Sequence, residues 1–200
     1  MPTGSTLPGM PERVDLGPCA AIRHEGDPAR CAVLLPGMIY PTRAPVLWFA
    51  REAVMSRGWS ALEVLGEPGT HPEPVAWERE CTERALEAAG QARVLVIGKS
   101  LASFMAGLVS DRDLPAAWLT PALDQDDVIE GLSRAGQRTL VVGGTADSMW
   151  VREALPDNQA LEVLELPGVD HALQVPGDIP ASLNALGEMV KAVARLADAA

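Results

Sequence analysis

The sequence has only 16 basic residues against 27 acidic ones, so the chain carries a formal net charge of -11. Nucleic acids reward clustered Lys and Arg, and this balance argues against a nucleic-acid partner. The three cysteines, Cys19, Cys31 and Cys81, are an odd number without metal-site spacing. No apolar run approaches the roughly 20 residues that span a bilayer, and the N-terminus lacks the features of a signal peptide. We therefore expect a cytoplasmic protein with no cofactor, metal or membrane partner.

The length of 200 residues suits one well-buried core and is short for two domains. Residues 1–17 are polar and rich in Pro and Gly, which predicts a flexible N-terminal tail, and residues 18–200 are expected to form a single domain. Apolar strand-like and helix-like segments alternate in the remainder, as in a parallel sheet covered by helices on both faces. The expected strands are Cys31–Leu35, Trp59–Leu65, Ala92–Ile97, Ala116–Thr120, Arg138–Val142 and Ala160–Leu166, and the expected helices are Thr42–Arg57, Pro74–Ala89, Leu101–Val109, Gln125–Ala135 and Ile179–Leu196. The predicted fold class is α/β, with a mostly parallel, doubly wound sheet in a three-layer sandwich.

The strongest candidate for chemistry follows a short apolar run. Val94–Ile97 is typical of a buried parallel strand, and Gly98-Lys99-Ser100-Leu101-Ala102 comes directly after it. A serine between a strand and a helix fits the nucleophile elbow, G-x-S-x-G, whose sharp turn demands small neighbours. The alternative is that Ser100 merely caps a helix. A phosphate-binding loop is excluded, because the glycine it needs five residues before Gly98 is Arg93.

The chain has three histidines that could serve as a base for such a serine. His24 lies in a polar stretch and is expected to be an exposed turn residue, and His71 lies in a Pro/Gly-rich loop. His171 follows a strand that ends in a Pro-Gly turn, in the last strand-to-helix loop, from which it can reach back to Ser100. His171 is therefore the predicted base.

Three aspartates compete for the role of the acid that orients this base. Asp147 lies just beyond a β-branched strand, where the small residues of Gly-Gly-Thr-Ala let the backbone leave the sheet. Asp124 follows the preceding strand and is the second choice, although it stands near a helix start where Asp is common for capping. Asp170 adjoins His171, but neighbouring residues in an extended loop point apart. Asp147 is the predicted acid.

The order Ser, Asp, His along the chain is the one found in α/β-hydrolases. The motifs that carry the resemblance are Leu35-Pro36-Gly37-Met38, Gly98-Lys99-Ser100-Leu101-Ala102, Gly143-Gly144-Thr145-Ala146-Asp147 and Val169-Asp170-His171. The sequence resembles a small α/β-hydrolase from about residue 31 to the C-terminus. The resemblance implies Ser100 as nucleophile, His171 as base, Asp147 as acid, and the amides of Met38 and Leu101 as the oxyanion hole. Two departures are Ala102 in place of the usual glycine and Pro36 where the oxyanion loop often has His.

The expected activity is hydrolysis of a carboxylic ester or thioester of a small-molecule acyl substrate through an acyl-serine. Tyr40, Met149 and Trp150 are expected to line the substrate pocket. Lys99 is expected to be solvated, with a substrate-facing cation as the alternative. The short connection before the predicted helix Gln125–Ala135 leaves no room for a cap domain. The alternatives are the same fold used for C–C bond cleavage or a biosynthetic cyclisation, and a non-catalytic binding protein.

Overall fold

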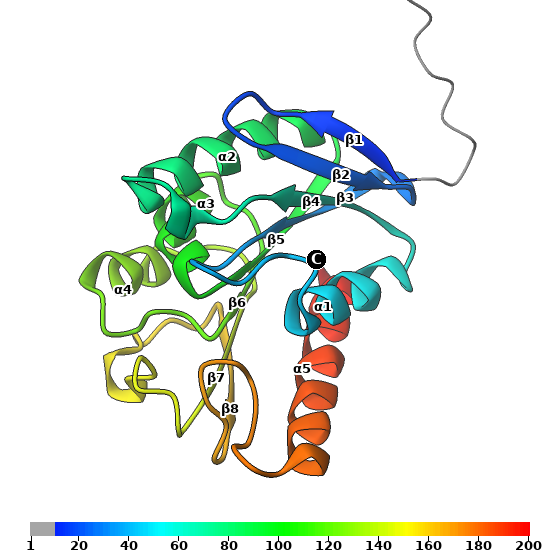
Figure 1. The fold of residues 1–200 in the computed structure, drawn as a ribbon. Coiled ribbons are helices and arrows are strands. Elements are labelled where there is room, and N and C mark those ends of the chain that lie inside the picture. Colours follow the sequence, from blue (N-terminus) through cyan, green and yellow to red (C-terminus); the bar gives the residue numbers. More distant parts are fainter. Residues whose placement is uncertain (1–10) are drawn as a thin grey trace, which may run out of the picture.

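The computed structural model describes residues 11–200, which form one sheet flanked by helices (Figure 1). The strands are β1 (Glu12–Asp15), β2 (Ala20–His24), β3 (Asp27–Leu35), β4 (Trp59–Leu65), β5 (Arg93–Lys99), β6 (Ala116–Leu119), β7 (Thr139–Gly144) and β8 (Leu161–Leu166). The α-helices are α1 (Pro45–Met55), α2 (Pro74–Ala89), α3 (Ala106–Asp111), α4 (Asp126–Ser133) and α5 (Ile179–Ala199).

The eight strands are ordered β1-β2-β4-β3-β5-β6-β7-β8. The strands from β3 to β8 pair in parallel, whereas β2 pairs antiparallel with both β1 and β4. Parallel pairing brings the carboxyl ends of β3 to β8 to one edge of the sheet, where ligands bind in open α/β folds. The predicted α/β fold class is confirmed.

Two helical layers cover the sheet, as Figure 1 shows: α1 and α5 on one face, and α2, α3 and α4 on the other. The strands are apolar on both faces because side chains alternate along them. In β3, Val33 and Leu35 join the core cluster under α2, α3 and α4, while Ala32 and Leu34 join the one under α1 and α5. All four side chains are fully buried, so this strand lies at the centre of the core.

The structure corrects three expectations about local structure. The flexible tail predicted over residues 1–17 is wrong for Glu12–Asp15, which form β1; residues 1–10 lie outside the described part of the chain. His24 is not an exposed turn residue, because it ends β2 and its imidazole lies 2.8 Å from the buried Glu63 carboxylate. The helix predicted over Leu101–Val109 is divided into a 3-10 turn, Ser100–Met105, and the short α3.

The connection from β6 to α4 is short and comprises residues 120–125. Within residues 11–200 no cap domain is inserted there or elsewhere in the sheet. No helix in this range is long and apolar enough to cross a lipid bilayer.

Candidate active site

Ser100 occupies a sharp turn between β5 and the 3-10 turn. Its backbone φ is +53°, in the left-handed region that is unfavourable for residues with a side chain. A Cβ placed on Gly98 would lie 2.7 Å from the Trp118 ring and 2.8 Å from the Cβ of Ala102. The residues two positions before and two positions after the serine must therefore be small. Ala102 meets this requirement in place of the usual glycine.

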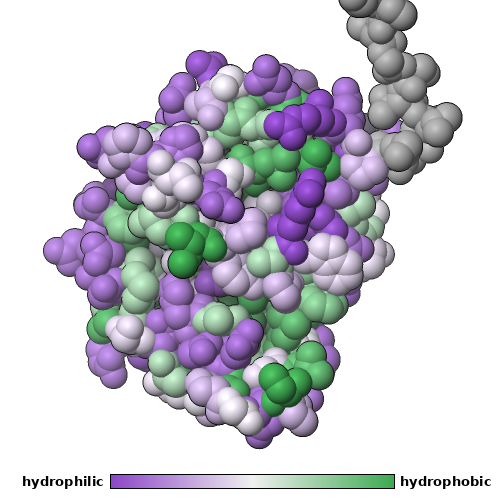
Figure 2. Space-filling model, viewed as in Figure 1, coloured by the Kyte–Doolittle hydropathy of each residue, from purple (hydrophilic) through white to green (hydrophobic). Residues whose placement is uncertain are grey.

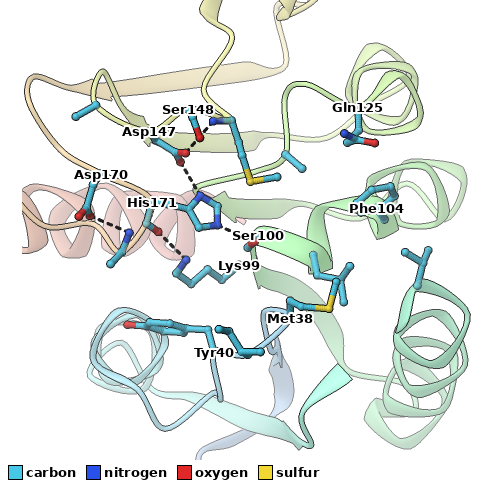
Figure 3. Close-up of a pocket in the computed structure, with 17 residues that line it drawn as sticks. Met38, Tyr40, Lys99, Ser100, Phe104, Gln125, Asp147, Ser148, Asp170 and His171 are labelled. Atoms are coloured by element: carbon cyan, nitrogen blue, oxygen red, sulfur yellow. Dashed lines mark hydrogen bonds and ion pairs between the residues drawn. The ribbon is translucent and has the colours of Figure 1, made fainter. Parts of the chain in front are cut away.

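Ser100, His171 and Asp147 form one hydrogen-bonded chain (Figure 3). The Ser100 hydroxyl lies 2.8 Å from Nε2 of His171, and Nδ1 of the same ring lies 2.7 Å from Oδ2 of Asp147. The Asp147 side chain is 1% exposed, whereas the His171 side chain is 37% exposed. A buried carboxylate thus fixes the imidazole at one nitrogen, and the other nitrogen faces the serine at the edge of the cavity.

The ends of β7 and β8 pack together closely enough to bring the aspartate and the histidine into contact. A Cβ on Gly144 would lie 2.1 Å from the carbonyl oxygen of Val169, so only glycine allows this approach. The amide of Asp147 donates to the Gly144 carbonyl at 3.0 Å, which turns the chain away from the sheet. Oδ1 of Asp147 accepts from the Met149 amide at 2.9 Å, and this bond leaves Oδ2 for His171.

The two rival aspartates do not contact the imidazole. Asp170 accepts the amides of Ala172 and Gln174 at 2.9 and 3.0 Å, so its carboxylate shapes its own loop. Asp124 is exposed in the segment before α4 and makes no hydrogen bond to His171. Of the three aspartates, the structure brings only Asp147 to His171.

The other histidines lie elsewhere in contacts of their own. His24 lies against Glu63, and the His71 ring stacks on Trp77 with their centroids 4.6 Å apart. Neither of them hydrogen-bonds Ser100 in the described part of the chain.

The two backbone amides predicted to form an oxyanion hole, those of Met38 and Leu101, belong to residues that line the same cavity as Ser100. Gly37 and Tyr40 bond each other across a tight turn at 2.8 and 3.3 Å, and a Cβ on Gly37 would lie 3.5 Å from that of Ser100. The Met38 amide, inside this turn, has no acceptor among residues 11–200. The Leu101 amide belongs to the first turn of a helical segment, where N–H groups lack an intrahelical partner.

A cavity of about 880 Å³ opens over the serine, within the usual size range of small-molecule sites. Its walls are mainly apolar, and Figure 3 shows Met38, Tyr40, Phe104 and Gln125 around it. The residues that line it are Met38, Ile39, Tyr40, Val75, Lys99, Ser100, Leu101, Phe104, Ala122, Gln125, Ala146, Asp147, Ser148, Met149, Asp170, His171 and Ala172. Ile39, Val75 and Phe104 were not predicted from the sequence, because they come from a loop and two helical segments and carry no motif.

Trp150 does not line this cavity, so its predicted role in substrate binding is wrong. Its ring packs on Gly143, where an added Cβ would lie 1.9 Å from the indole, and its Nε1 donates to Glu165 at 2.7 Å. The turn after Asp147 directs Met149 into the cavity and Trp150 into the core cluster under α2, α3 and α4.

Lys99 is 1% exposed, so the expectation that it is solvated is wrong. Its ammonium donates to Oγ1 of Thr120 at 2.9 Å and to the main-chain carbonyl of His171 at 2.8 Å. It also lies 4.6 Å from the centroid of the Tyr40 ring. Burial lowers the pKa of Lys99 from 10.5 to about 8, against the opposing effect of the Asp147 and Asp170 carboxylates.

No group of three or more His, Cys, Asp or Glu side chains in residues 11–200 is arranged to hold a metal ion.

No family model and no curated protein matches this sequence. Solved structures do match: a serine hydrolase homologue from Coxiella burnetii superposes with a TM-score of 0.72 at 12% identity, over 96% of this chain and 99% of that one. A serine hydrolase without a lid from Xanthomonas campestris gives 0.70 at 13% identity, over 95% and 94%. The chain has the α/β-hydrolase fold. Dienelactone hydrolase from Anabaena variabilis shares this fold at a TM-score of 0.71 and 15% identity, over 94% and 95%.

The chain order of the three bonded side chains agrees with the α/β-hydrolase fold. In that fold the order is Ser, then Asp or Glu, then His, each beyond the end of a strand. Ser100 follows β5, Asp147 follows β7 and His171 follows β8.

Proposed function

We propose that the protein is a serine hydrolase that cleaves carboxylic esters or thioesters through an acyl-serine. The observation that carries the proposal is the chain of hydrogen bonds from Asp147 through His171 to Ser100, at a strained turn that faces a cavity. A serine hydroxyl is a weak nucleophile until a positioned base removes its proton, and this chain supplies both the base and the group that orients it.

In the first half of the reaction, Oγ of Ser100 attacks the carbonyl carbon while Nε2 of His171 takes the hydroxyl proton. The imidazolium is stabilised by Asp147. The amides of Met38 and Leu101 hydrogen-bond the oxyanion that forms. The bond to the leaving oxygen or sulfur then breaks, and His171 returns the proton to that atom.

In the second half, a water molecule replaces the leaving group. His171 removes a proton from this water as its oxygen attacks the acyl carbon, and the bond to Oγ breaks with the proton returned to Ser100. The products are a carboxylic acid and the alcohol or thiol, and the enzyme is regenerated with water as the only co-substrate.

The lining of the cavity favours a neutral, apolar acyl substrate. Apolar side chains form most of the wall, and the charged residues that line it are Lys99, Asp147 and Asp170. Each of these three is already engaged in hydrogen bonds within the protein. Among residues 11–200, no lysine or arginine that lines the cavity is left free to bind an anionic leaving group.

A fluorophosphonate probe tests the nucleophile directly. We expect the wild type to be labelled and to hydrolyse p-nitrophenyl octanoate, and Ser100→Ala to lose labelling and roughly 10⁶-fold in kcat, as in a comparable triad. Ser133→Ala, which alters an exposed hydroxyl on α4, is the matched control. If the wild type is neither labelled nor active, the cavity is a binding site and not the active site of a serine hydrolase. A labelled wild type that cleaves no ester or thioester uses its serine for another reaction, such as C–C hydrolysis.

A matched pair of thioesters tests the preference for neutral substrates. Octanoyl-N-acetylcysteamine and octanoyl-coenzyme A present the same reacting bond, but only the second carries phosphates. We expect kcat/KM for the coenzyme A thioester to be at least about tenfold lower, which corresponds to about 1.4 kcal/mol. An equal or higher value for octanoyl-coenzyme A would contradict this preference while leaving the serine mechanism intact.

A further inference from the structure

Lys99 connects three separate loops of the candidate site. It is the last residue of β5, directly before Ser100, and Figure 3 shows its side chain extending beneath the His171 loop. Its ammonium bonds Thr120 at the end of β6 and the carbonyl of His171 after β8, and it lies over the ring of Tyr40 from the loop after β3. The lysine next to the nucleophile therefore contacts the loop that carries the base.

The environment of this ammonium is costly for a charge. Lysine is almost never fully buried unless it is paired, and no carboxylate among residues 11–200 lies within 4.0 Å of Nζ. Its partners are a hydroxyl, a carbonyl oxygen and an aromatic face. An apolar side chain of the same length would fill this space without the desolvation penalty. Packing alone therefore does not account for a lysine here.

The Lys99 ammonium holds the main chain of His171, the proposed base, through a hydrogen bond to its carbonyl oxygen. Among the described residues, the bond to Lys99 is the one hydrogen bond made by the backbone of His171. Asp170 organises the loop internally through the amides of Ala172 and Gln174, but these bonds do not tie it to the sheet. The ring of His171 is held by Asp147, and its backbone is held by Lys99.

We propose that charged Lys99 is a positioning residue: its ammonium holds the carbonyl of His171 against the ends of β5 and β6 and so keeps the imidazole on Ser100. This inference rests on the proposed function. A misplacement of about 1 Å in a reacting group can cost about 100-fold in rate, so the loss of this anchor lowers kcat. Lys99 forms little of the cavity surface because it is 1% exposed, and KM changes little.

The proposal predicts an alkaline limb in the pH profile of activity. The pKa of Lys99 is about 8, lowered by burial against Asp147 and Asp170. Above that pH the amine loses its charge and one of its donors, which weakens its hold on the His171 carbonyl and on Tyr40 and Thr120. Burial raises the pKa of the Tyr40 phenol, so this group does not titrate in the same range. We expect kcat to fall as the pH rises through about 8.

The principal test is Lys99→Met, with Lys191→Met as the matched control because Lys191 is exposed on α5. With p-nitrophenyl octanoate, we expect Lys99→Met to lower kcat by about 100-fold and to leave KM within about a factor of two. It should also abolish the alkaline limb, whereas Lys191→Met keeps the wild-type rate and profile. The stoichiometry of fluorophosphonate labelling counts correctly folded sites, so a slower rate at full stoichiometry is not a folding defect.

Thr120→Val gives a second test that retains the lysine. The Thr120 hydroxyl accepts a hydrogen bond from the Lys99 ammonium and so favours the charged form of the lysine. Removal of this hydroxyl should move the alkaline limb to lower pH.

The proposal is overturned if Lys99→Met keeps the wild-type kcat or retains the limb. If Lys99→Met does not fold, an unmoved limb in Thr120→Val overturns it. Failure of the serine mechanism gives a different result, because the wild type would then resist the fluorophosphonate probe.

Discussion

Asp147 and Asp170 are both carboxylates near His171, but their hydrogen bonds give them different roles. One oxygen of Asp147 accepts from the imidazole and the other from the Met149 amide. Oδ1 of Asp170 accepts two amides of its own loop. Proximity in sequence therefore does not show which carboxylate is bonded to the imidazole, whereas the acceptor geometry does.

The change Asp147→Asn should lower kcat by about 10⁴, as the equivalent change does in a serine protease triad. An amide in this position no longer holds the imidazole in the required tautomer. Asp124→Asn is the control, because Asp124 is exposed and does not contact His171. Both variants are measured at one pH with p-nitrophenyl octanoate. A severe loss in the Asp124 variant alone would show that the acid follows β6 rather than β7.

The sequence was sufficient to find the three bonded side chains but not every residue around them. Ser100, Asp147 and His171 each follow a strand, and parallel strands end at one edge, so their meeting follows from chain order. The burial of Lys99 depends on loops that come from three other strands, and no local pattern encodes it. The direction of Trp150 depends on the space left by Gly143, seven residues earlier, and the turn between them carries no periodic pattern that shows which side chain points inward.

At the scale of elements, α2 contains a buried carboxyl group without a partner. Glu78 is fully buried and neither of its carboxyl oxygens has a hydrogen-bond partner within the described chain. Burial raises its pKa well above the usual 4.5, with a further contribution from Cys19. When the pKa of a carboxyl group is higher in the folded state than in the unfolded state, its contribution to stability is fully present below the pKa of the unfolded state. This contribution is lost as the pH rises through the pKa of the folded state.

Glu78→Met should therefore stabilise the protein, and more at pH 8 than at pH 4. At pH 4 the wild-type group is mostly protonated in both states, whereas at pH 8 folding must neutralise it or bury its charge. The expected gain in the free energy of unfolding is about 1–3 kcal/mol, the usual cost of an unsatisfied buried polar group. Urea denaturation at the two pH values measures it. A gain that is larger at pH 4 would contradict the assignment.

The parallel class of the sheet could be predicted because short, mainly apolar strand segments alternate with helical segments along the chain. The N-terminal hairpin could not, because Glu12–Asp15 and Ala20–His24 contain charged residues that are typical of a loop. β1 is held by pairing with β2, and β2 is held by pairing with β4 and by long-range side-chain contacts. Glu63 of β4 makes one set of these contacts: it accepts hydrogen bonds from Thr42 and Arg51 and lies 2.8 Å from His24 of β2. Such contacts involve residues far apart in sequence, so no local window reveals them.

At the scale of the whole molecule, the chain carries an excess of acidic residues. The formal net charge is -11, and Figure 2 shows hydrophilic and hydrophobic residues interspersed over one face. The large apolar side chains that are exposed include Met38, Ile39 and Val75, which also line the cavity. We therefore expect the net negative charge to repel an anionic substrate at long range, before it reaches the apolar entrance.

Salt should therefore affect charged and neutral substrates differently. Raising the salt concentration from 0.1 M to 1 M shortens the screening length from about 10 Å to about 3 Å. We expect kcat/KM for octanoyl-coenzyme A to rise over this range, and the value for octanoyl-N-acetylcysteamine to change little by comparison. Parallel rate measurements at several salt concentrations test this. An equal response of both substrates would mean that the net charge plays no part in selection.

The left-handed backbone at Ser100 places stability and activity in opposition at one position. A residue with a side chain in this conformation costs roughly 1–2 kcal/mol, which glycine would avoid. Selection for a longer-lived fold alone would thus favour the change Ser100→Gly, and under the proposed function it is turnover that retains the hydroxyl. A lineage that no longer needed the reaction would gain stability through the same substitution that abolishes it.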